Sequence, residues 1–415
     1  MNKKYPKVLI VGNTFDEFSG AGVTLTNLFK NWPKEKIAVA ATSDVNYNYC
    51  ERERPCSAYY SFAGGINKSQ KDANYKRKKK NQSFIRKVVV DLSAKVGHKD
   101  WDNSFPVDKR FLDFYDEFNP DVIYSSMGNI ALMRFMIKLR SQRKFRLVIH
   151  IWDEFLGRYN YRWFPSLWKR IGDHYFLKAI NMDDVVCLAI GDKMADDYGR
   201  RYGKIFYPFH NPVDPMLWDS VELKQPTIPT VAYFGKVNKN TITALQEMAE
   251  AVEQINKDGI AVRFLVHSGM NDSSLNELFA HFKYSELADL LPREDIPAAF
   301  KSSSVLFFPI SFDEKSIKYQ KLSIQTKLTE YLISRVPIFM YSSPEIAAYQ
   351  YLSENDAAIT CEHGVPAIIE KLKILLQNPS CGDKVSNNAY ELALRKHTTN
   401  YVREKFLDTI LNAKS

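Results

Sequence analysis

Short, uninterrupted apolar runs recur along this chain, and turn residues bound each of them. Runs of this length, without alternating polar residues, are typical of strands that are buried on both faces of a sheet. The segments between them show helical spacing of apolar residues, most clearly at 245–256 and 366–376. Repeated strand and helix units of this kind predict an α/β fold with mostly parallel sheets. The expected strands are 8–11, 37–41, 122–124, 147–151, 185–189, 231–234, 262–266, 305–308, 338–340 and 358–360.

The periodic pattern breaks once, at 209–229, where prolines and polar residues replace it. We interpret this stretch as a linker between an N-terminal Rossmann-like domain at 1–208 and a C-terminal one at 230–386. Ligands bind at the carboxyl ends of parallel strands in such domains, so we expect the two domains to face each other across a cleft. The helical segment at 387–415 either belongs to the second domain or packs back on the first.

Length and composition allow two hydrophobic cores, with 415 residues of which 45% are hydrophobic. No stretch approaches the roughly 20 apolar residues that a membrane-spanning helix needs, and the start runs into a strand without a signal-peptide core. The five cysteines are scattered, without CxxC pairs or the density of a disulfide scaffold. These features predict a cytoplasmic protein in a reducing compartment.

Positive charge is concentrated in one segment. The net charge is +9, and residues 68–87 carry nine Lys or Arg residues against a single acid, Asp72. Most runs of this kind are solvated loops. The functional alternatives are contact with anionic lipid headgroups, which would place the protein peripherally on the inner face of the cell membrane, or with nucleic acid. No nucleic-acid-binding module surrounds the segment, so nucleic acid is the less favoured partner.

Two loops of the N-terminal domain follow predicted strands and hold candidate site residues. Gly20, Ala21 and Gly22 begin a helix, where small residues let backbone amides and the helix dipole approach an anion. A tight strand-to-helix turn would explain the same residues. At the end of the fourth predicted strand, His150 and Asp153 are candidates for catalysis. The alternative for His150 is a buried, hydrogen-bonded histidine.

The C-terminal domain carries the candidate residues for binding a phosphorylated ligand. Lys236 and Lys239 follow a strand and a glycine, where lysines can neutralise a diphosphate. A helix is expected to begin near Thr326 and Lys327, and its amide-rich start suits phosphate. Glu330, one turn on, can accept two hydrogen bonds from a ribose diol. The plainer alternatives are solvated loop lysines and a capped helix with a surface glutamate.

A set of segments occurs in a recognisable order along the chain: Ser19-Gly20-Ala21-Gly22-Val23-Thr24, His150-Ile151-Trp152-Asp153-Glu154, Asn211-Pro212-Val213-Asp214, Gly235-Lys236, and Thr326-Lys327-Leu328-Thr329-Glu330-Tyr331-Leu332 followed by Val336-Pro337-Ile338. Over nearly its whole length the chain resembles retaining GT-B glycosyltransferases, and it is similar to the family 4 enzymes that build bacterial capsules, O-antigens and related polysaccharides.

This resemblance implies an enzyme that transfers a hexosyl or related sugar, with retention, from a nucleotide-sugar donor to a saccharide or lipid-linked saccharide acceptor. In the family, the glutamate that Glu330 matches holds the ribose, and the preceding loop contacts the diphosphate and the sugar. The leaving diphosphate is stabilised electrostatically, so neither a cofactor nor an obligatory metal is expected.

The sequence departs from the family pattern in two places. The family often has a second glutamate eight positions before the ribose-binding one, and Leu322 stands there. The family's basic pair is also spaced more widely than Lys236 and Lys239. Within the polar loop 311–325, Asp313 is a candidate for part of the missing acidic function.

Other chemistry has weaker support. The motif Asp100-Trp101-Asp102 matches the metal-binding DxD of the other major glycosyltransferase fold, but no apolar strand precedes it. No convincing Ser, Cys or zinc constellation is present. A nucleotide-sugar epimerase of the same fold and a degenerate, non-catalytic binding subunit remain as alternatives, because a fold does not fix a function.

Overall fold

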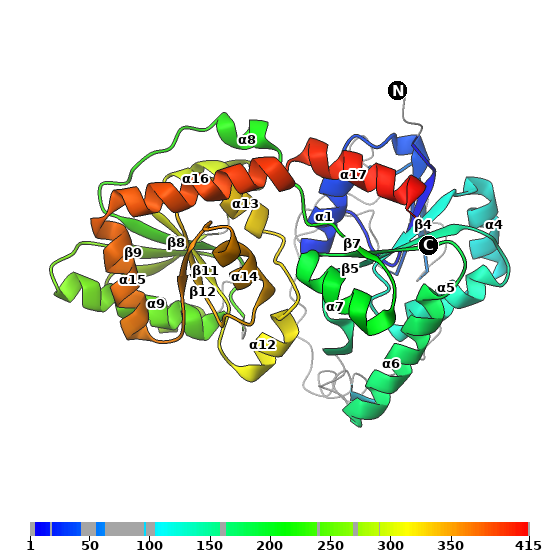
Figure 1. Cartoon of the computed structure of the whole chain (residues 1–415), viewed down its shortest axis with the longest axis horizontal. Helices are drawn as coiled ribbons and strands as arrows, with labels where there is room; N and C mark the ends of the chain where they lie inside the picture. Colours follow the sequence, from blue (N-terminus) through cyan, green and yellow to red (C-terminus); the bar gives the residue numbers. More distant parts are fainter. Residues whose placement is uncertain are drawn as a thin grey trace. The chain divides into compact units, whose positions relative to one another are not determined.

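The computed structural model describes residues 5–16, 19–42, 55–62, 95–96, 104–157, 163–238, 241–268, 273–289 and 291–413. The chain divides into two compact units (Figure 1). Unit 1 comprises Met1–Asn211 and Val402–Ser415, and unit 2 comprises Pro212–Tyr401. The basic segment 68–87 and the Asp100-Trp101-Asp102 motif lie outside the described residues.

In the described part of unit 1, seven strands form one parallel sheet in the order β3-β2-β1-β4-β5-β6-β7. The strand β1 pairs on both sides, with Val8 opposite Ile37 of β2 and Val122 of β4. The order of the strands therefore reverses at β1, which creates a switch point at its carboxyl end. The strands are β1 (Val8–Val11), β2 (Ile37–Ala41), β3 (Ala58–Ser61), β4 (Val122–Ser125), β5 (Arg146–Ile151), β6 (Val185–Ala189) and β7 (Phe206–Pro208).

In the described part of unit 2, six strands form a second parallel sheet in the order β10-β9-β8-β11-β12-β13. Here β8 lies between β9 and β11, so the second switch point is at the carboxyl end of β8. The strands are β8 (Thr230–Phe234), β9 (Arg263–His267), β10 (Ser285–Ala288), β11 (Val305–Pro309), β12 (Ile338–Tyr341) and β13 (Ile359–Cys361).

Helices connect successive strands in both units, as parallel pairing requires, wherever the structure describes the connection. Most of the connection from β2 to β3 lies outside the described residues. The helical elements of unit 1 are α1 (Gly20–Leu28), η1 (Lys34–Lys36), α4 (Lys109–Phe118), α5 (Ile130–Arg140), α6 (Pro165–Ile180) and α7 (Asp192–Tyr202). Those of unit 2 are α8 (Pro215–Asp219), α9 (Ile242–Lys257), α10 (Ser273–Phe279), η4 (Arg293–Asp295), α11 (Ile296–Lys301), α12 (Glu314–Gln320), α13 (Leu328–Ile333), α14 (Ala347–Glu354), α15 (Val365–Gln377) and α16 (Pro379–Lys396). The last helix, α17 (Thr399–Asn412), begins in unit 2 and continues in unit 1.

The sheet of unit 2 has a separate hydrophobic core on each face. On one face, Phe307 and Tyr341 pack with residues of α9 and α15. On the other, Phe308 and Met340 pack with residues of α13, α14 and α16. Figure 1 shows α9 and α15 apart from α13 and α16, with the strands between them. Adjacent residues of one strand therefore reach different layers, and a side chain at a strand end is assigned to one face by its neighbours.

The carboxyl-terminal segment contributes to both units in turn. Residues of α16, among them Tyr390, belong to a core of unit 2. The helix stops at Lys396, and Val213 exchanges backbone hydrogen bonds of 2.8 Å with His397 and Thr399. Beyond this break, Phe406 of α17 packs in the core of unit 1. Within the segment 387–415, residues before the helix break thus pack in unit 2, and residues of α17 pack in unit 1.

The expected α/β architecture with parallel sheets is confirmed, and each expected strand exists within one residue at either end. Three further strands, β3, β7 and β10, were not expected. All three lie at the edge of their sheet, where fewer residues need to be apolar. The expected polar loop 311–325 also contains α12. In the described part of the chain, no helix is long and apolar enough to cross a membrane.

Candidate functional site

Lys327 lies in the turn that leads into α13, and its side chain reaches the carboxyl end of β8. Its Nζ donates to the carbonyl oxygen of Phe234 at 3.1 Å and lies 4.2 Å from the centroid of the Tyr233 ring. Gly235 follows directly, and a Cβ there would come within 2.9 Å of the Tyr233 hydroxyl and 3.2 Å of Nζ. Glycine is required at this position because the lysine and the tyrosine approach the backbone so closely.

Lys327 and Glu330 are both held in environments that weaken their charges. Burial lowers the pKa of Lys327 to about 7, although Glu330 acts in the opposite direction. Burial likewise raises the pKa of Glu330, although the positive charges of Arg293 and Lys327 act to lower it. An ammonium group that loses solvation without a full counter-charge gains stability when an anion arrives. The pair is therefore suited to a ligand that brings negative charge to Lys327.

The other predicted donor-site residues lie near this turn or outside the described residues. Thr326 precedes Lys327 and is partly buried, and its carbonyl oxygen accepts a hydrogen bond of 3.4 Å from Thr329 Oγ1. Lys236 is exposed in the loop after β8, and its carbonyl oxygen accepts a 2.9 Å hydrogen bond from the Tyr233 hydroxyl. Lys239 lies outside the described residues. The structure thus brings the loop of Lys236 to the Lys327 turn through Phe234 and Tyr233.

Arg293 was not singled out in the sequence. It lies in η4, far from Glu330 along the chain, and its charge acts on the Glu330 carboxylate. The only sequence signal was its place after Pro292 in a short polar segment between predicted strands.

Asp16 occupies the start of α1, where the sequence suggested a site for an anionic ligand. Its carboxylate accepts hydrogen bonds from the Ser19 amide at 2.5 Å and the Ser19 hydroxyl at 2.7 Å. The Ser19 hydroxyl in turn accepts a 3.0 Å bond from the Gly22 amide. A Cβ at Gly22 would lie 2.3 Å from the Asp16 carboxyl carbon. Gly22 is needed for this internal contact, while Gly20 is exposed and Ala21 is partly exposed.

His150 is completely buried in unit 1, with both ring nitrogens in hydrogen bonds. Nε2 lies 3.1 Å from the carbonyl oxygen of Phe209, and Nδ1 lies 2.6 Å from the Tyr124 hydroxyl. Because a carbonyl only accepts, Nε2 carries the proton and Nδ1 accepts from Tyr124. Burial lowers the pKa of His150 to about 3. Of the two sequence interpretations, this placement favours the buried, hydrogen-bonded histidine.

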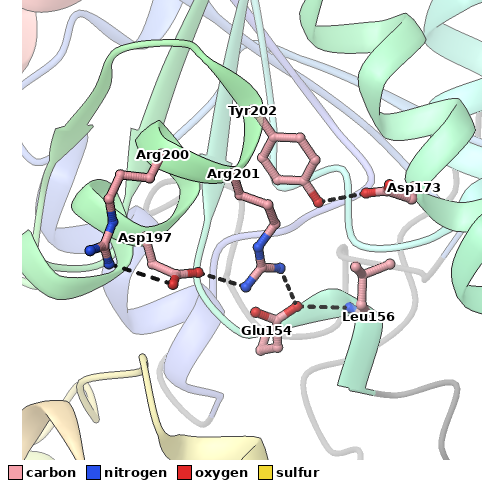
Figure 2. Close-up of polar contacts among 7 residues, drawn as sticks. All are labelled: Glu154, Leu156, Asp173, Asp197, Arg200, Arg201 and Tyr202. Atoms are coloured by element: carbon pink, nitrogen blue, oxygen red, sulfur yellow. Dashed lines mark hydrogen bonds and ion pairs between the residues drawn. The ribbon is translucent and has the colours of Figure 1, made fainter.

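Asp153 is exposed in the loop that follows β5, next to a network of charged residues. Glu154 accepts from Arg201 at 3.3 Å and from the Leu156 amide at 3.3 Å. Arg201 also pairs with Asp197 at 2.6 Å, as Figure 2 shows. Burial acts to lower the pKa of Arg201, but Glu154, Tyr198 and Asp197 together outweigh it and raise that pKa. The network ties the loop of Asp153 to α7.

A second contact in Figure 2 holds the end of α7, where the Tyr202 hydroxyl donates to Asp173 of α6 at 2.8 Å. Sequence reasoning missed these partners, because Arg201 and Tyr202 look like ordinary residues at the end of an amphipathic helix. Their only signal was a pair of arginines in the last helical turn.

Asp313, the candidate for part of the missing acidic function, caps α12. Its carboxylate accepts hydrogen bonds from the backbone amide of Ser316 at 3.0 Å and from the Ser316 hydroxyl. Leu322, at the position where the family often has a glutamate, is buried. Among the described residues, no group of three or more His, Cys, Asp or Glu is arranged to hold a metal ion.

Two cavities among the described residues of unit 2 are lined by residues outside the Lys327 turn. One, of about 230 Å³, is lined by Thr243, Glu247, Ser311, Phe312, Asp313 and His363. The other, of about 340 Å³, includes Arg263, His267 and Leu291 in its lining. Neither cavity is lined by Lys327 or Glu330.

Comparison with known proteins identifies the fold. No model of a protein family matches the chain, and no curated protein matches it. Solved structures are similar over almost the whole chain. Sucrose-phosphate synthase from Thermosynechococcus elongatus has a TM-score of 0.63 at 10% identity, covering 96% of this chain and 96% of its own. The Anabaena protein HepE in complex with UDP-glucose has a TM-score of 0.65 at 10% identity, covering 98% of this chain and 100% of its own.

The similar structures also include a protein described as a putative UDP-N-acetylglucosamine 2-epimerase from Listeria monocytogenes. Its TM-score is 0.55 at 10% identity, and it covers 98% of this chain and 96% of its own. The structural neighbours are mostly glycosyltransferases, and the chain has their GT-B fold, as the sequence predicted. Identity at this level shows the fold, whereas the activity has to be argued from the site.

Proposed function

We propose that the protein is a glycosyltransferase that uses a nucleotide-sugar donor, and that unit 2 binds this donor. One observation carries the proposal, namely the paired environment of Lys327 and Glu330 at the carboxyl end of β8. That end of the sheet is the switch point, where doubly wound domains bind nucleotides. A bound UDP-glucose in the similar HepE structure supports the choice of ligand class.

In this proposal, Glu330 accepts hydrogen bonds from the ribose hydroxyls, and Lys327, Thr326 and Lys236 contact the diphosphate, with Lys239 as a further candidate. The bond between the sugar carbon and the diphosphate breaks, and the acceptor hydroxyl forms the new bond and gives its proton to the departing phosphate. Negative charge grows on the diphosphate in the transition state. Lys327 stabilises that charge best in a poorly solvated position, where electrostatic interactions are stronger.

On the acceptor side we propose Asp153, because it is exposed on a loop that the Glu154 and Arg201 pair anchors. Retention at the sugar carbon, a saccharide or lipid-linked acceptor and a role in surface polysaccharide synthesis complete the proposal, and the family resemblance supports them. The basic segment 68–87 would bring the protein to the anionic inner surface of a membrane, where a lipid-linked acceptor is found.

An epimerase of the same fold is the second candidate, since one similar structure bears that description. Leu322 at the position of the expected glutamate keeps a non-catalytic binding subunit as a third. An epimerase converts a nucleotide sugar to its isomer without any acceptor, whereas a glycosyltransferase releases the nucleoside diphosphate. A non-catalytic binding subunit would do neither.

The test is a thermal-shift screen with UDP, GDP and ADP and their glucose or mannose conjugates, followed by product analysis for each stabilising donor. A ligand that binds only the folded protein raises its melting temperature. We expect one nucleotide class to stabilise the protein and its conjugate to release free nucleoside diphosphate. Isomerised sugar nucleotide would support the epimerase, and no stabilisation by any of these compounds would contradict the proposal.

A further inference from the structure

The cavity of about 230 Å³ in unit 2 has a lining that the proposed donor site does not use. Its residues follow the carboxyl ends of β11 and β13 or lie in the first turns of α9. The ring of Phe312, which lines it, packs against the core shared by α9 and α15. The Lys327 turn instead leads into α13, on the opposite face of the sheet. The cavity and α13, which carries Glu330, therefore lie on different faces of the sheet, whereas Lys236 lies in the loop that leads into α9.

Ser311 gives the first sign that the cavity is built for a ligand. The residue is only 3% exposed, and its hydroxyl has no hydrogen-bond partner among the described residues. A buried hydroxyl without a partner loses the hydrogen bonds that water would give it, which is unfavourable unless a ligand restores them. A hydroxyl can donate one bond and accept others, so its best partner is a group that does both.

Glu247 gives the second sign. One carboxylate oxygen accepts from the Tyr341 hydroxyl at 2.9 Å, and the other lies 3.1 Å from Nε2 of His363. Tyr341 is itself fixed, because its hydroxyl accepts a 2.9 Å bond from the Gly364 amide. The Glu247 side chain is 18% exposed, and each of its oxygens can accept a further bond. A positioned carboxylate in the cavity wall thus retains acceptor capacity.

The aromatic side of the cavity comes from Phe312. Its ring centroid lies 4.9 Å from that of Tyr341 and 4.7 Å from that of His363. The three rings hold one another in place and present an apolar surface beside the polar groups. Aromatic rings with fixed neighbours offer contact area at little cost in conformational entropy.

The chemistry of the lining selects among ligand classes. The carboxylates of Glu247 and Asp313 disfavour an anion, and the site therefore does not suit a phosphate. A sugar ring has hydroxyls that donate to Glu247, hydroxyls that both donate to and accept from Ser311, and a C–H face that packs on Phe312. The volume is below the roughly 300 to 1,000 Å³ of pockets for drug-sized ligands, which fits one ring rather than an oligosaccharide.

We propose that this cavity binds a single neutral sugar ring, at a site separate from the proposed donor site. The ring's hydroxyls bond to Ser311 and Glu247, and its apolar face lies against Phe312. The site exists whether or not unit 2 binds a nucleotide sugar, so it stands independently of the proposed function.

The test is binding of D-glucose to the full chain. Saturation-transfer NMR detects the binding, and a titration measures the affinity. Ser311→Ala and Glu247→Gln change few atoms, and each is expected to weaken glucose binding about tenfold through loss of a hydrogen bond. Glu250→Gln is the matched control, because Glu250 is an exposed residue of the same helix. Lys327→Met is the control for the donor site and should leave glucose affinity unchanged.

Parallel titrations with propylammonium and inorganic phosphate test the other ligand classes. Glucose binding that does not change in Ser311→Ala and Glu247→Gln would overturn the proposal. Binding of propylammonium that depends on Glu247, without glucose binding, would also overturn it in favour of a cation site. Melting temperatures confirm that each variant is folded, and if Glu247→Gln is not, Ser311→Ala alone decides.

Discussion

The Nζ of Lys327 donates to the carbonyl oxygen of Phe234 at 3.1 Å, although burial lowers the pKa of this lysine to about 7. A single carbonyl is a weak substitute for the water that the ammonium group has lost. The contact fixes where the lysine points without satisfying its charge. This arrangement makes Lys327 the residue whose state should change most when an anionic ligand binds, and it gives two predictions.

The first prediction concerns stability and pH. In the unfolded chain the pKa of Lys327 returns to about 10.4. Between about pH 7 and pH 10 the unfolded chain therefore holds a proton that the folded protein has released, and the free energy of unfolding rises with pH. Lys327→Met removes this contribution. Its melting temperature should therefore rise less than that of the parent when the pH is raised from 7 to 9.5. Lys315→Met, at an exposed position, should follow the parent.

The second prediction concerns proton uptake on binding UDP. At pH 8.5 the free protein holds Lys327 mostly unprotonated. A diphosphate beside it raises its pKa, so binding should take up about one proton. Calorimetric titrations in buffers of different ionisation enthalpy measure that number. Proton uptake should vanish in Lys327→Met and persist in Lys315→Met. If the parent binds UDP without taking up a proton, the proposed contact between Lys327 and the diphosphate is contradicted.

The third prediction tests Glu330 as the ribose ligand. Glu330→Gln keeps the shape of the side chain and removes its charge, so the affinity for the nucleotide should fall by about 1.5 to 3 kcal/mol. Glu354→Gln, at an exposed position in α14, is the control and should bind as the parent does. Uridine carries the ribose without the diphosphate. Its affinity, measured by competition with UDP in both variants, therefore separates ribose contacts from phosphate contacts. Equal affinity in the Glu330 variant would remove this assignment.

The fourth prediction separates a core role of His150 from a catalytic one. Its pKa of about 3 lies below the ordinary value of about 6.5. As pH falls between these values the unfolded chain takes up a proton and the folded protein does not, so stability decreases. His150→Ala should lower the free energy of unfolding at pH 7.5 by about 2 to 4 kcal/mol, because it leaves a cavity and an unpaired Tyr124 hydroxyl.

Between pH 6.5 and 4.5, the stability of His150→Ala should therefore decrease less than that of the parent. His174→Ala is the control, since His174 is exposed on α6. A His150 variant that is as stable as the parent, but transfers no sugar, would restore the catalytic interpretation.

The sequence predicted most of the fold because buried parallel strands need continuous apolar runs, as in 147–151 and 305–308. It missed β10 (Ser285–Ala288), an edge strand with a glutamate in its centre. It also placed Thr326, Lys327 and Glu330 at a helix start, which a local pattern can do.

Contacts between distant segments were beyond such reasoning. The bond from Lys327 to Phe234 spans 93 positions of the chain, and the pair of Tyr341 and Glu247 spans 94. The hydrophobic pattern does not encode which loops meet at the end of a sheet. The same limit explains why His150 kept two interpretations until its partners, Tyr124 and Phe209, were known.

The last prediction concerns Asp153 and the pair that anchors its loop. If Asp153 acts only in the transition state, Asp153→Asn should lower kcat by about a hundredfold or more while nucleotide affinity stays that of the parent. Arg201→Met should act differently, because Arg201 pairs with Glu154 and the proposal gives it no contact with the substrate. Loss of this 3.3 Å ion pair frees the loop, so the acceptor KM should rise and kcat should fall less.

Arg200→Met is the matched control for the loop. Arg200 neighbours Arg201 in α7, but its side chain is exposed and its ion pair with Asp197 is long, at 3.9 Å. Loss of Arg200 should therefore change neither KM nor kcat. Steady-state rates with UDP-glucose or whichever donor stabilises the protein, measured over a range of acceptor concentrations, separate the two effects. Parental rates in Asp153→Asn would exclude Asp153 from the reaction. The acceptor would then have to be handled by residues 20–24 at the start of α1, where the Asp16 carboxylate lies beside Gly22.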